Sequence, residues 1–430
     1  MSLPDPPAPE TSPYAVLRNR DFVLYAVGRF IASLGQQMLT VAVGWELYER
    51  THSALALGFT GLTQFLPMVA MTLPAGHFAD TRSRKGIIMV AQGMMAAASL
   101  GLALISWRQA PVSLVYLCLL FSGVARAFHW SASASFLPLL VSREEFPRAL
   151  NWSSSTFQFS AVTGPAVGGL LIGWLNSALS VYLFNAVAAV VCLALIACVR
   201  THHRPVVKET PSLKTLLGGF HFVFNHRIIL GMISLDLFAV LFGGADMLLP
   251  IYAKDILHVG PRGLGWLRAA LPAGSLVCAL IVAHLPIFTK AGRALVWAVV
   301  VFGLATIGFG FSQWFWLSLL MLFLCGMADT ISILIRHTSV QLLTPDEMRG
   351  RVSSVNNLFI STSNDLGGFE SGAVSYFCGP VFSVVFGGLA SIAVVAAVCW
   401  LLPEIPRYGR LVQPAPPSLP GPEGPAAKTS

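Results

Sequence analysis

The chain has 430 residues, of which 55% are hydrophobic and only 11% are charged, and its mean hydropathy is +0.71. Soluble domains usually carry about 25% charged residues, so this composition excludes a single water-soluble core and indicates a protein embedded in a lipid bilayer. The formal net charge of +8 comes from short Lys and Arg clusters between apolar stretches, which favours membrane topology over nucleic-acid binding.

The first half of the chain predicts a tail and six spanning helices. Residues 1–20 are polar and rich in proline, which predicts a disordered cytoplasmic tail rather than a cleaved signal. A spanning helix needs about 20 apolar residues, and six such stretches predict a first bundle over 21–199. These spans are predicted at 22–47, 54–79, 86–107, 112–140, 149–173 and 178–199.

The second half repeats this organisation. Residues 200–227 form the longest polar stretch between spans and predict a cytoplasmic linker, and 403–430 predict a second disordered cytoplasmic tail. A second six-helix bundle is predicted over 228–402. Its spans are predicted at 228–253, 263–288, 294–311, 314–343, 352–376 and 379–402. The predicted fold is an all-α membrane protein with twelve transmembrane helices in two pseudo-symmetric six-helix bundles.

Basic residues are unequally divided between the two sides of the predicted membrane. With both tails inside, the cytoplasmic segments hold 19 Lys and Arg, whereas the opposite side holds four. The positive-inside rule then places both termini in the cytoplasm, in a protein integral to the bacterial cytoplasmic (inner) membrane. The four outer residues are Arg50, Arg108, Lys254 and Arg262.

The two halves are similar to each other in sequence. A shift of 203 positions aligns Gly164 and Gly169 with Gly367 and Gly372. Weak internal symmetry of this kind is typical of transporters built from repeated bundles.

Ten ionisable side chains lie within the predicted spans, where each costs roughly 2.5–3.5 kcal/mol at the bilayer centre. The first, fourth, seventh and tenth spans all carry charge, whereas the third, sixth, ninth and twelfth carry none. This period predicts that every third helix lines a central polar cavity. The ten residues are Arg29, Glu46, Arg126, Asp236, Asp246, Arg268, Asp329, Arg336, Asp365 and Glu370.

These residues divide into candidate roles. Glu46 and Asp246 lie near the outer ends of their spans, which favours solvated or snorkelled positions for both. Two amides, Gln36 and Gln37, are further candidates for the cavity, because an amide in hydrocarbon needs a partner. The candidate proton carriers are Asp236, Asp329, Asp365 and Glu370. The candidates for holding an anionic ligand, or for acting electrostatically on the carboxylates, are Arg29, Arg126, Arg268 and Arg336.

Arg126 and Asp329 occupy equivalent positions at the 203-residue offset and carry opposite charges. Two interpretations remain open for them. They form either a substrate or proton site at the midplane, or a structural ion pair that holds the two halves together.

The loop after the second span reads Gly76-His-Phe-Ala-Asp80-Thr-Arg82-Ser-Arg84-Lys85. It resembles the GxxxDRxxRR-like loop signature of the major facilitator superfamily, with Thr81 at the place of the first Arg. The resemblance implies a cytoplasmic gate made by Gly76, Asp80, Arg82, Arg84 and Lys85.

A second motif lies in the fifth span, where the chain reads Gly164-Pro165-Ala-Val-Gly168-Gly169. It is similar to the GPxxGG stretch of the drug:proton antiporter branch of the same superfamily. Its proline bends a helix and its glycines allow close helix contact, so ordinary small-residue packing remains an alternative interpretation.

Longer segments resemble the enterobactin-exporter-like branch. They are Trp45-Glu-Leu-Tyr48 through Pro67, Asp236 through Lys254, and Arg349-Gly-Arg-Val through Gly372. The resemblance covers nearly all of 14–402 and implies a proton-driven antiporter that exports a small amphipathic molecule, such as a drug-like compound or a siderophore, by alternating access.

Other functions remain open. They are an uptake symporter or lipid transporter on the same fold, and a membrane sensor or assembly partner that transports nothing. The sequence shows no GxSxG, HExxH or Walker loop and no CxxC pair among its 7 Cys, so we expect neither an enzyme nor a metal or other cofactor. The expected partners are a small-molecule substrate, protons and the lipid bilayer, with no nucleic acid, and we expect a monomer.

The predicted topology is testable with reporter fusions. Because basic residues concentrate on one side, we expect reporters fused at Lys214 and after Arg410 both to be active only in the cytoplasm. A fusion after Arg108 serves as the external control. A periplasmic signal from either of the first two sites would contradict the orientation.

Overall fold

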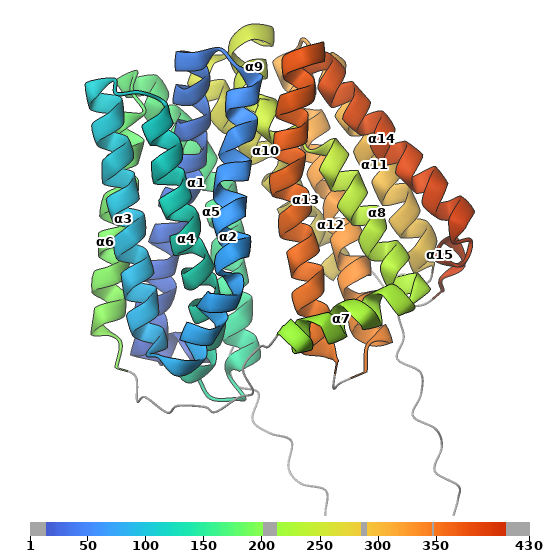
Figure 1. The fold of residues 1–430 in the computed structure, drawn as a ribbon, viewed down its shortest axis with the longest axis horizontal. Coiled ribbons are helices and arrows are strands. Elements are labelled where there is room, and N and C mark those ends of the chain that lie inside the picture. Colours follow the sequence, from blue (N-terminus) through green and yellow to red (C-terminus); the bar gives the residue numbers. More distant parts are fainter. Residues whose placement is uncertain (1–13, 201–212, 285–289, 346–347, 410–430) are drawn as a thin grey trace, which may run out of the picture.

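The computed structural model describes residues 14–200, 213–284, 290–345 and 348–409, and its long helices form two bundles (Figure 1). The first bundle contains α1 (Arg20–Thr51), α2 (Ala54–Thr81), α3 (Arg84–Arg108), α4 (Ser113–Phe136), α5 (Phe146–Leu175) and α6 (Leu179–Cys198). The second contains α8 (Arg227–Gly243), α10 (Gly260–Ala283), α11 (Ala291–Phe311), α12 (Phe315–Leu343), α13 (Arg349–Cys378) and α14 (Pro380–Leu401).

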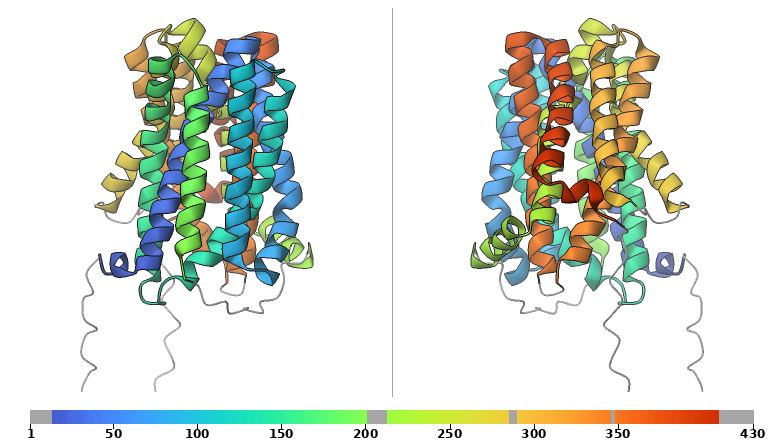
Figure 2. Two further views of the ribbon diagram at one scale, coloured as in Figure 1. Left: turned by 90° about the vertical axis from the view of Figure 1, so that its left-hand side faces the viewer. Right: turned by 90° about the vertical axis from the view of Figure 1, so that its right-hand side faces the viewer.

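Short elements connect these helices. They are η1 (Ala15–Arg18), η2 (Leu137–Leu139), α7 (Leu213–Asn225), η3 (Asp246–Leu248), α9 (Leu249–Ile251), the π-helix η4 (Tyr252–Ile256) and α15 (Glu404–Arg407). Viewed from either side, the long helices run roughly along one axis, while α7 lies across that axis at one end (Figure 2).

Ten helices in the described part of the chain are long and apolar enough to cross a membrane. The all-helical membrane fold predicted from the sequence is therefore confirmed. Two further long helices, α1 and α13, have 32 and 30 residues but are more polar along their length. They pack inside the same bundles as the other helices.

The predicted symmetry of the two bundles is confirmed by their packing. In the first bundle α1 packs on α5 and α6, and α4 packs on α2 and α3; in the second bundle α8 packs on α13 and α14, and α12 packs on α10 and α11. The two major contacts between the bundles follow the same symmetry. When each helix is replaced by its counterpart in the other bundle, the contact of α5 with α10 becomes the contact of α13 with α2.

Glycines bring the helices of the two bundles into backbone contact. A Cβ built on Gly169 of α5 would lie 2.7 Å from the Cα of Gly265 of α10. On the other side, a Cβ on Gly372 of α13 would lie 2.8 Å from the Cα of Gly58 of α2. Side chains larger than hydrogen are excluded at both crossings.

Both glycine crossings lie at the end of the molecule remote from the start of α1. Gly58 follows the start of α2 directly after α1 has ended at Thr51, and Gly169 lies near the end of α5. The bundles converge at this end, beside α9, and diverge toward α7 (Figure 1). The described structure is therefore closed at the end away from α7.

Three segments differ from the sequence-based expectations. The predicted linker contains α7, whose apolar face packs on α13 and α8, while residues 201–212 lie outside the described structure. The predicted C-terminal tail begins with α15, which packs on α11; residues 410–430, and 1–13 of the predicted N-terminal tail, are outside the described residues. The seventh predicted span, 228–253, is interrupted after Gly243 and continues as η3, α9 and the π-helix.

The glycine crossings predict a specific sensitivity to small substitutions. We expect Gly169→Ala to lower the free energy of unfolding by about 1–3 kcal/mol, because its methyl group meets helix backbone rather than a movable side chain. Thermal unfolding of the purified protein in detergent would measure this loss. Gly93→Ala is the matched control, because a Cβ there meets only Leu193 at 3.8 Å. Equal stability of the two variants would contradict the role of the crossing.

Candidate functional site

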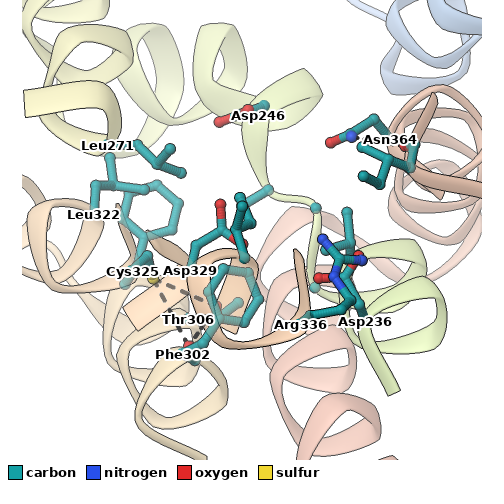
Figure 3. A pocket seen from close by; sticks show the side chains of 17 residues that line it. Asp236, Asp246, Leu271, Phe302, Thr306, Leu322, Cys325, Asp329, Arg336 and Asn364 are labelled. Carbon is teal, nitrogen blue, oxygen red and sulfur yellow. Dashed lines mark hydrogen bonds and ion pairs between the residues drawn. The ribbon is translucent and has the colours of Figure 1, made fainter. Parts of the chain in front are cut away.

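The interruption after α8 creates a cavity inside the second bundle. α8 ends at Gly243 and Gly244, and the Gly244 carbonyl accepts a hydrogen bond of 3.0 Å from the Ser371 hydroxyl of α13. A cavity of about 110 Å³ lies here between α8, η3, α10, α11, α12 and α13. Three residues of its lining are exposed: Ile333 of α12, and Asp246 and Asn364, which are labelled in Figure 3.

A buried ion pair forms one wall of this cavity. Nη1 of Arg336 donates to Oδ2 of Asp236, and only 2% of Arg336 and 4% of Asp236 is exposed. Nε of Arg336 is buried without a hydrogen-bond partner among the described residues. Buried charges of this kind are costly to separate, because each loses its only compensation in a medium without water.

Two more carboxyl groups share the cavity with this pair (Figure 3). Asp329 is half-buried and lies seven residues before Arg336, two turns away on the same face of α12. Asp246 begins η3, and its carbonyl oxygen accepts a 3.3 Å hydrogen bond from Nη2 of Arg268. The cavity thus gathers three acidic side chains around a single guanidinium group in its lining.

The polar residues of the first bundle are arranged differently. Arg126 of α4 donates to Oε1 of Gln64 at 2.9 Å and contacts the sulfur of Met68 at 3.6 Å, both on α2. One turn further along α4, Nε2 of His129 lies 3.3 Å from the Ser133 hydroxyl. The half-buried Arg29 on α1 interacts electrostatically with His129.

Arg126 and Asp329 do not form the structural ion pair that one of the two interpretations expected. Arg126 binds Gln64 within its own bundle, whereas Asp329 lies in the cavity of the second bundle near Asp236 and Arg336. Equivalent positions in the two repeats here face different surroundings, so opposite charge at those positions does not produce contact.

Asp365 is the carboxylate that lies closer to Arg126. α13 packs on α2 so that a Cβ on Gly61 would lie 2.9 Å from the carbonyl oxygen of Asp365. Gln64, the partner of Arg126, is one turn beyond Gly61, and Arg126 acts electrostatically on Asp365. The α2–α13 contact therefore brings charges of the two bundles together.

The remaining candidates on α1 and α13 are half-buried. Oε2 of Glu370 accepts a 3.4 Å hydrogen bond from Ser371. Gln37 packs under the fifth-helix motif, where a Cβ on Gly164 would lie 2.6 Å from the Cβ of Gln37, and Gln36 is its neighbour on α1. Of the two acids expected in solvated or snorkelled positions, Asp246 is exposed, whereas Glu46 is buried and forms a 3.3 Å ion pair with Arg50.

The predicted gate loop contacts the ends of its own bundle. Nη1 of Arg84 donates to the carbonyl of Ser135 in the last turn of α4 at 3.2 Å. Nζ of Lys85 donates to the carbonyls of Ala197 and Val199 at the end of α6, at 2.7 and 2.8 Å. These cations satisfy terminal carbonyls and complement the helix dipoles.

Three other residues belong to the predicted gate loop. Arg82 is exposed at the end of α2, Gly76 is half-buried, and the side chain of Asp80 is outside the described part of the chain.

The glycines of the fifth-helix motif pack α5 against two other helices, α1 of its own bundle and α10 of the second bundle. Gly164 and Gly168 face Gln37 and Met38 of α1, where a Cβ on Gly168 would lie 3.0 Å from the Cα of Met38. Gly169 and the carbonyl of Pro165 face Gly265 of α10. The motif therefore holds α5 between its own bundle and the other one.

Sequence reasoning missed a group of contacts that join the bundles at the closed end. The Tyr48 hydroxyl of α1 donates to Oδ2 of Asp255 in the π-helix, and Nζ of Lys254 lies 5.9 Å from the Trp45 ring centre. Nη2 of Arg262 donates to the Gly173 carbonyl at 3.0 Å. Lys254 and Arg262, two of the four basic residues predicted on the outer side, could have indicated these contacts. They entered only the count of basic residues that predicts the topology.

Comparisons with known proteins agree with this architecture. The model of the family described as Major Facilitator Superfamily matches residues 25–368. The enterobactin exporter EntS of Citrobacter koseri is 28% identical over 395 residues, covering 92% of this chain and 94% of the relative. The enterobactin exporter EntS of Escherichia coli O1:K1 / APEC is 26% identical, covering 89% and 92%.

Solved structures of transporters share the fold at low identity. A bacterial homologue of the human lysosomal transporter Spinster, in an inward-facing and occupied conformation, superposes with a TM-score of 0.72 at 16% identity, covering 92% of this chain and 98% of that one. The nucleoside transporter NupG gives a TM-score of 0.70 at 15% identity, covering 89% and 98%.

The buried ion pair predicts a large asymmetry between single and double substitutions. We expect Arg336→Met to destabilise the protein by about 3–5 kcal/mol, because Asp236 is left buried without its cation. The double variant Asp236→Leu with Arg336→Met should recover most of that loss in thermal unfolding. Arg143→Met, at an exposed arginine, is the control and should have little effect. A double variant as unstable as the single one would contradict the pairing.

Proposed function

Because the chain belongs to the Major Facilitator Superfamily and is therefore a membrane transporter, we propose that it is a proton-coupled exporter of a small amphipathic molecule. The observation that carries the proposal is the cavity of the second bundle, where Asp236, Asp246 and Asp329 surround Arg336. Ionisable groups within a transporter bundle mark ion and proton pathways, because their cost is tolerated only where they act.

The ion pair gives protonation a mechanical consequence. A proton that reaches Asp236 removes the negative partner of Arg336, and the guanidinium then lies buried without compensation. Arg336 must then find another acceptor or move, and either response breaks the contact that holds α12 against α8 at this point. Asp329, on the same face of α12 as Arg336 and more exposed than Asp236, is the group we propose to receive the proton first.

The transported molecule would bind between the bundles. Arg29 and Arg126 place positive charge on the first bundle, and Asp365 and Glu370 place carboxylates on the facing helix α13. An amphipathic molecule with an anionic group fits the arginine side of this arrangement. Relatives named as enterobactin exporters support a siderophore as the first cargo to test, and export as the direction.

The contacts at the closed end support alternating access. We propose twelve spans, α1 to α6, α8 with its continuation, and α10 to α14, with both termini in the cytoplasm and one chain as the working unit. In this orientation the bundles diverge toward the cytoplasmic side (Figure 1) and are joined at the outer side by Tyr48–Asp255 and the Arg262–Gly173 hydrogen bond. Outward opening would separate these partners while the cytoplasmic ends approach.

The proposal is tested by transport in inverted membrane vesicles. We expect enterobactin uptake that requires an imposed pH gradient, and a loss of at least about 100-fold in the coupled rate for Asp329→Asn, because a positioned proton acceptor is removed. Glu49→Gln is the control, since that side chain is exposed at the outer end of α1.

Three results would contradict parts of this proposal. Wild-type vesicles that do not accumulate enterobactin would contradict the siderophore as cargo. Accumulation without a pH gradient would contradict proton coupling. Full activity of the Asp329→Asn variant would exclude Asp329 as the carrier.

A further inference from the structure

A second, much smaller cavity lies between Asp329 and the buried ion pair. Its volume is about 10 Å³, and it is lined by residues of α8, α11 and α12. Asp236, Val240, Phe302 and Asp329 line both this cavity and the larger one, so the two are adjacent. A space of this size accommodates about one water molecule.

One polar side chain in this small cavity has no role in the packing. The hydroxyl of Ser332 is buried, with 4% of the residue exposed, and has no hydrogen-bond partner among the described residues. Buried hydroxyl groups are nearly always hydrogen-bonded, so an unpartnered one that lines a cavity indicates a ligand there.

The helix geometry places this hydroxyl between the two carboxyl groups. Asp329, Ser332 and Arg336 are spaced i, i+3 and i+7 on α12 and therefore lie on one face. That face meets Asp236 of α8. The rest of the lining is apolar: Ala239, Val240, Ala298, Val299, Phe302 and Ala328.

We propose that Ser332 holds a single water molecule that carries the proton from Asp329 to Asp236. The three polar neighbours, two carboxyl groups and one hydroxyl, match the two to four hydrogen bonds that a buried water requires. This proposal rests on the proposed proton coupling and adds the path by which the proton reaches the ion pair.

The step is balanced within the site. The carboxyl O–H bond of Asp329 breaks as its proton passes to the water oxygen, and one O–H bond of the water breaks as that proton passes to Asp236. One new O–H bond forms on the water and one on Asp236, so a single proton has moved and the water is regenerated. Ser332 is a positioning residue, because it orients the water and does not itself exchange the transferred proton.

The experiment follows proton arrival at Asp236 in the purified full-length protein. A light-triggered proton release lowers the pH, and time-resolved infrared spectroscopy follows the carboxyl bands, assigned by their loss in Asp236→Asn and Asp329→Asn. We expect Ser332→Ala to slow the appearance of the Asp236 band about tenfold, because the water loses its anchor, while the Asp329 band appears at the wild-type rate.

Two further variants distinguish a relay from a packing effect. Ser332→Gly leaves room for a second water in place of the hydroxyl and should restore most of the rate. Ser339→Ala removes a fully buried serine two turns further along α12 that lines neither cavity, and should leave the rate unchanged. A wild-type rate in Ser332→Ala, an unrescued rate in Ser332→Gly, or equal slowing in Ser339→Ala would each overturn the relay.

These experiments distinguish a wrong proposal for the water relay from a wrong proposal for the function. The infrared measurement needs no cargo, so slowed transfer in Ser332→Ala supports the relay whatever the protein transports. Reconstituted wild-type vesicles that move no protons in response to an enterobactin gradient would reject the proposed exchange while leaving the relay result intact.

Discussion

The close approach of helix backbones at two glycine crossings is the constraint on which the rest of the structure depends. A bilayer offers no hydrophobic drive for helices to associate, so packing contacts must hold the two bundles together. Gly169 with Gly265, and Gly372 with Gly58, provide these contacts at equivalent places on opposite sides of the molecule. Since they involve backbone rather than interlocking side chains, the alternating access proposed above would force no large side chain out of place at either crossing.

The glycine crossings follow the symmetry of the two bundles, but the contacts of the charged side chains inside the bundles do not. Arg126 and Asp329 are equivalent by position, yet the first binds an amide of α2 and the second lines a cavity beside a buried ion pair. The second bundle has the space for this cavity because α8 stops at Gly243, whereas its counterpart α1 continues unbroken for 32 residues. A change in one helix of the repeat has therefore given the two bundles different chemistry on the same scaffold.

The sequence predicted the helices and the presence of buried charge, but not which charges meet. Hydropathy defines a span because every backbone group inside a bilayer must be satisfied within a helix. Hydropathy does not define how a helix is rotated about its own axis. It could therefore not show that the charged residues of α12 lie beside Asp236 rather than beside Arg126. The helix α7 was missed because it has only 13 residues and its polar residues interrupt the continuous apolar run by which spans were found. The π-helix was missed because hydropathy does not distinguish it from an α-helix, and the predicted span ended at 253, before Lys254 and Asp255. Ser332 gave no signal at all, since serine in a span is ordinary until the structure shows that its buried hydroxyl has no hydrogen-bond partner among the described residues.

One continuous segment links the buried ion pair to the contacts that close the outer end. Asp236 lies in α8, and the chain passes the break at Gly244 and Pro250 of α9 before it reaches Lys254 and Asp255 in the π-helix. The segment is anchored at one end by Arg336 and at the other by Tyr48 of the opposite bundle. Its π-helix has wider hydrogen-bond spacing than an α-helix, a geometry that occurs frequently at functional sites. In the proposed transport cycle, a shift of α8 against α12 would therefore act on a segment that is held at both ends and interrupted in the middle. By this connection, the protonation that we propose at Asp236 would weaken the contact of Asp255 with the first bundle.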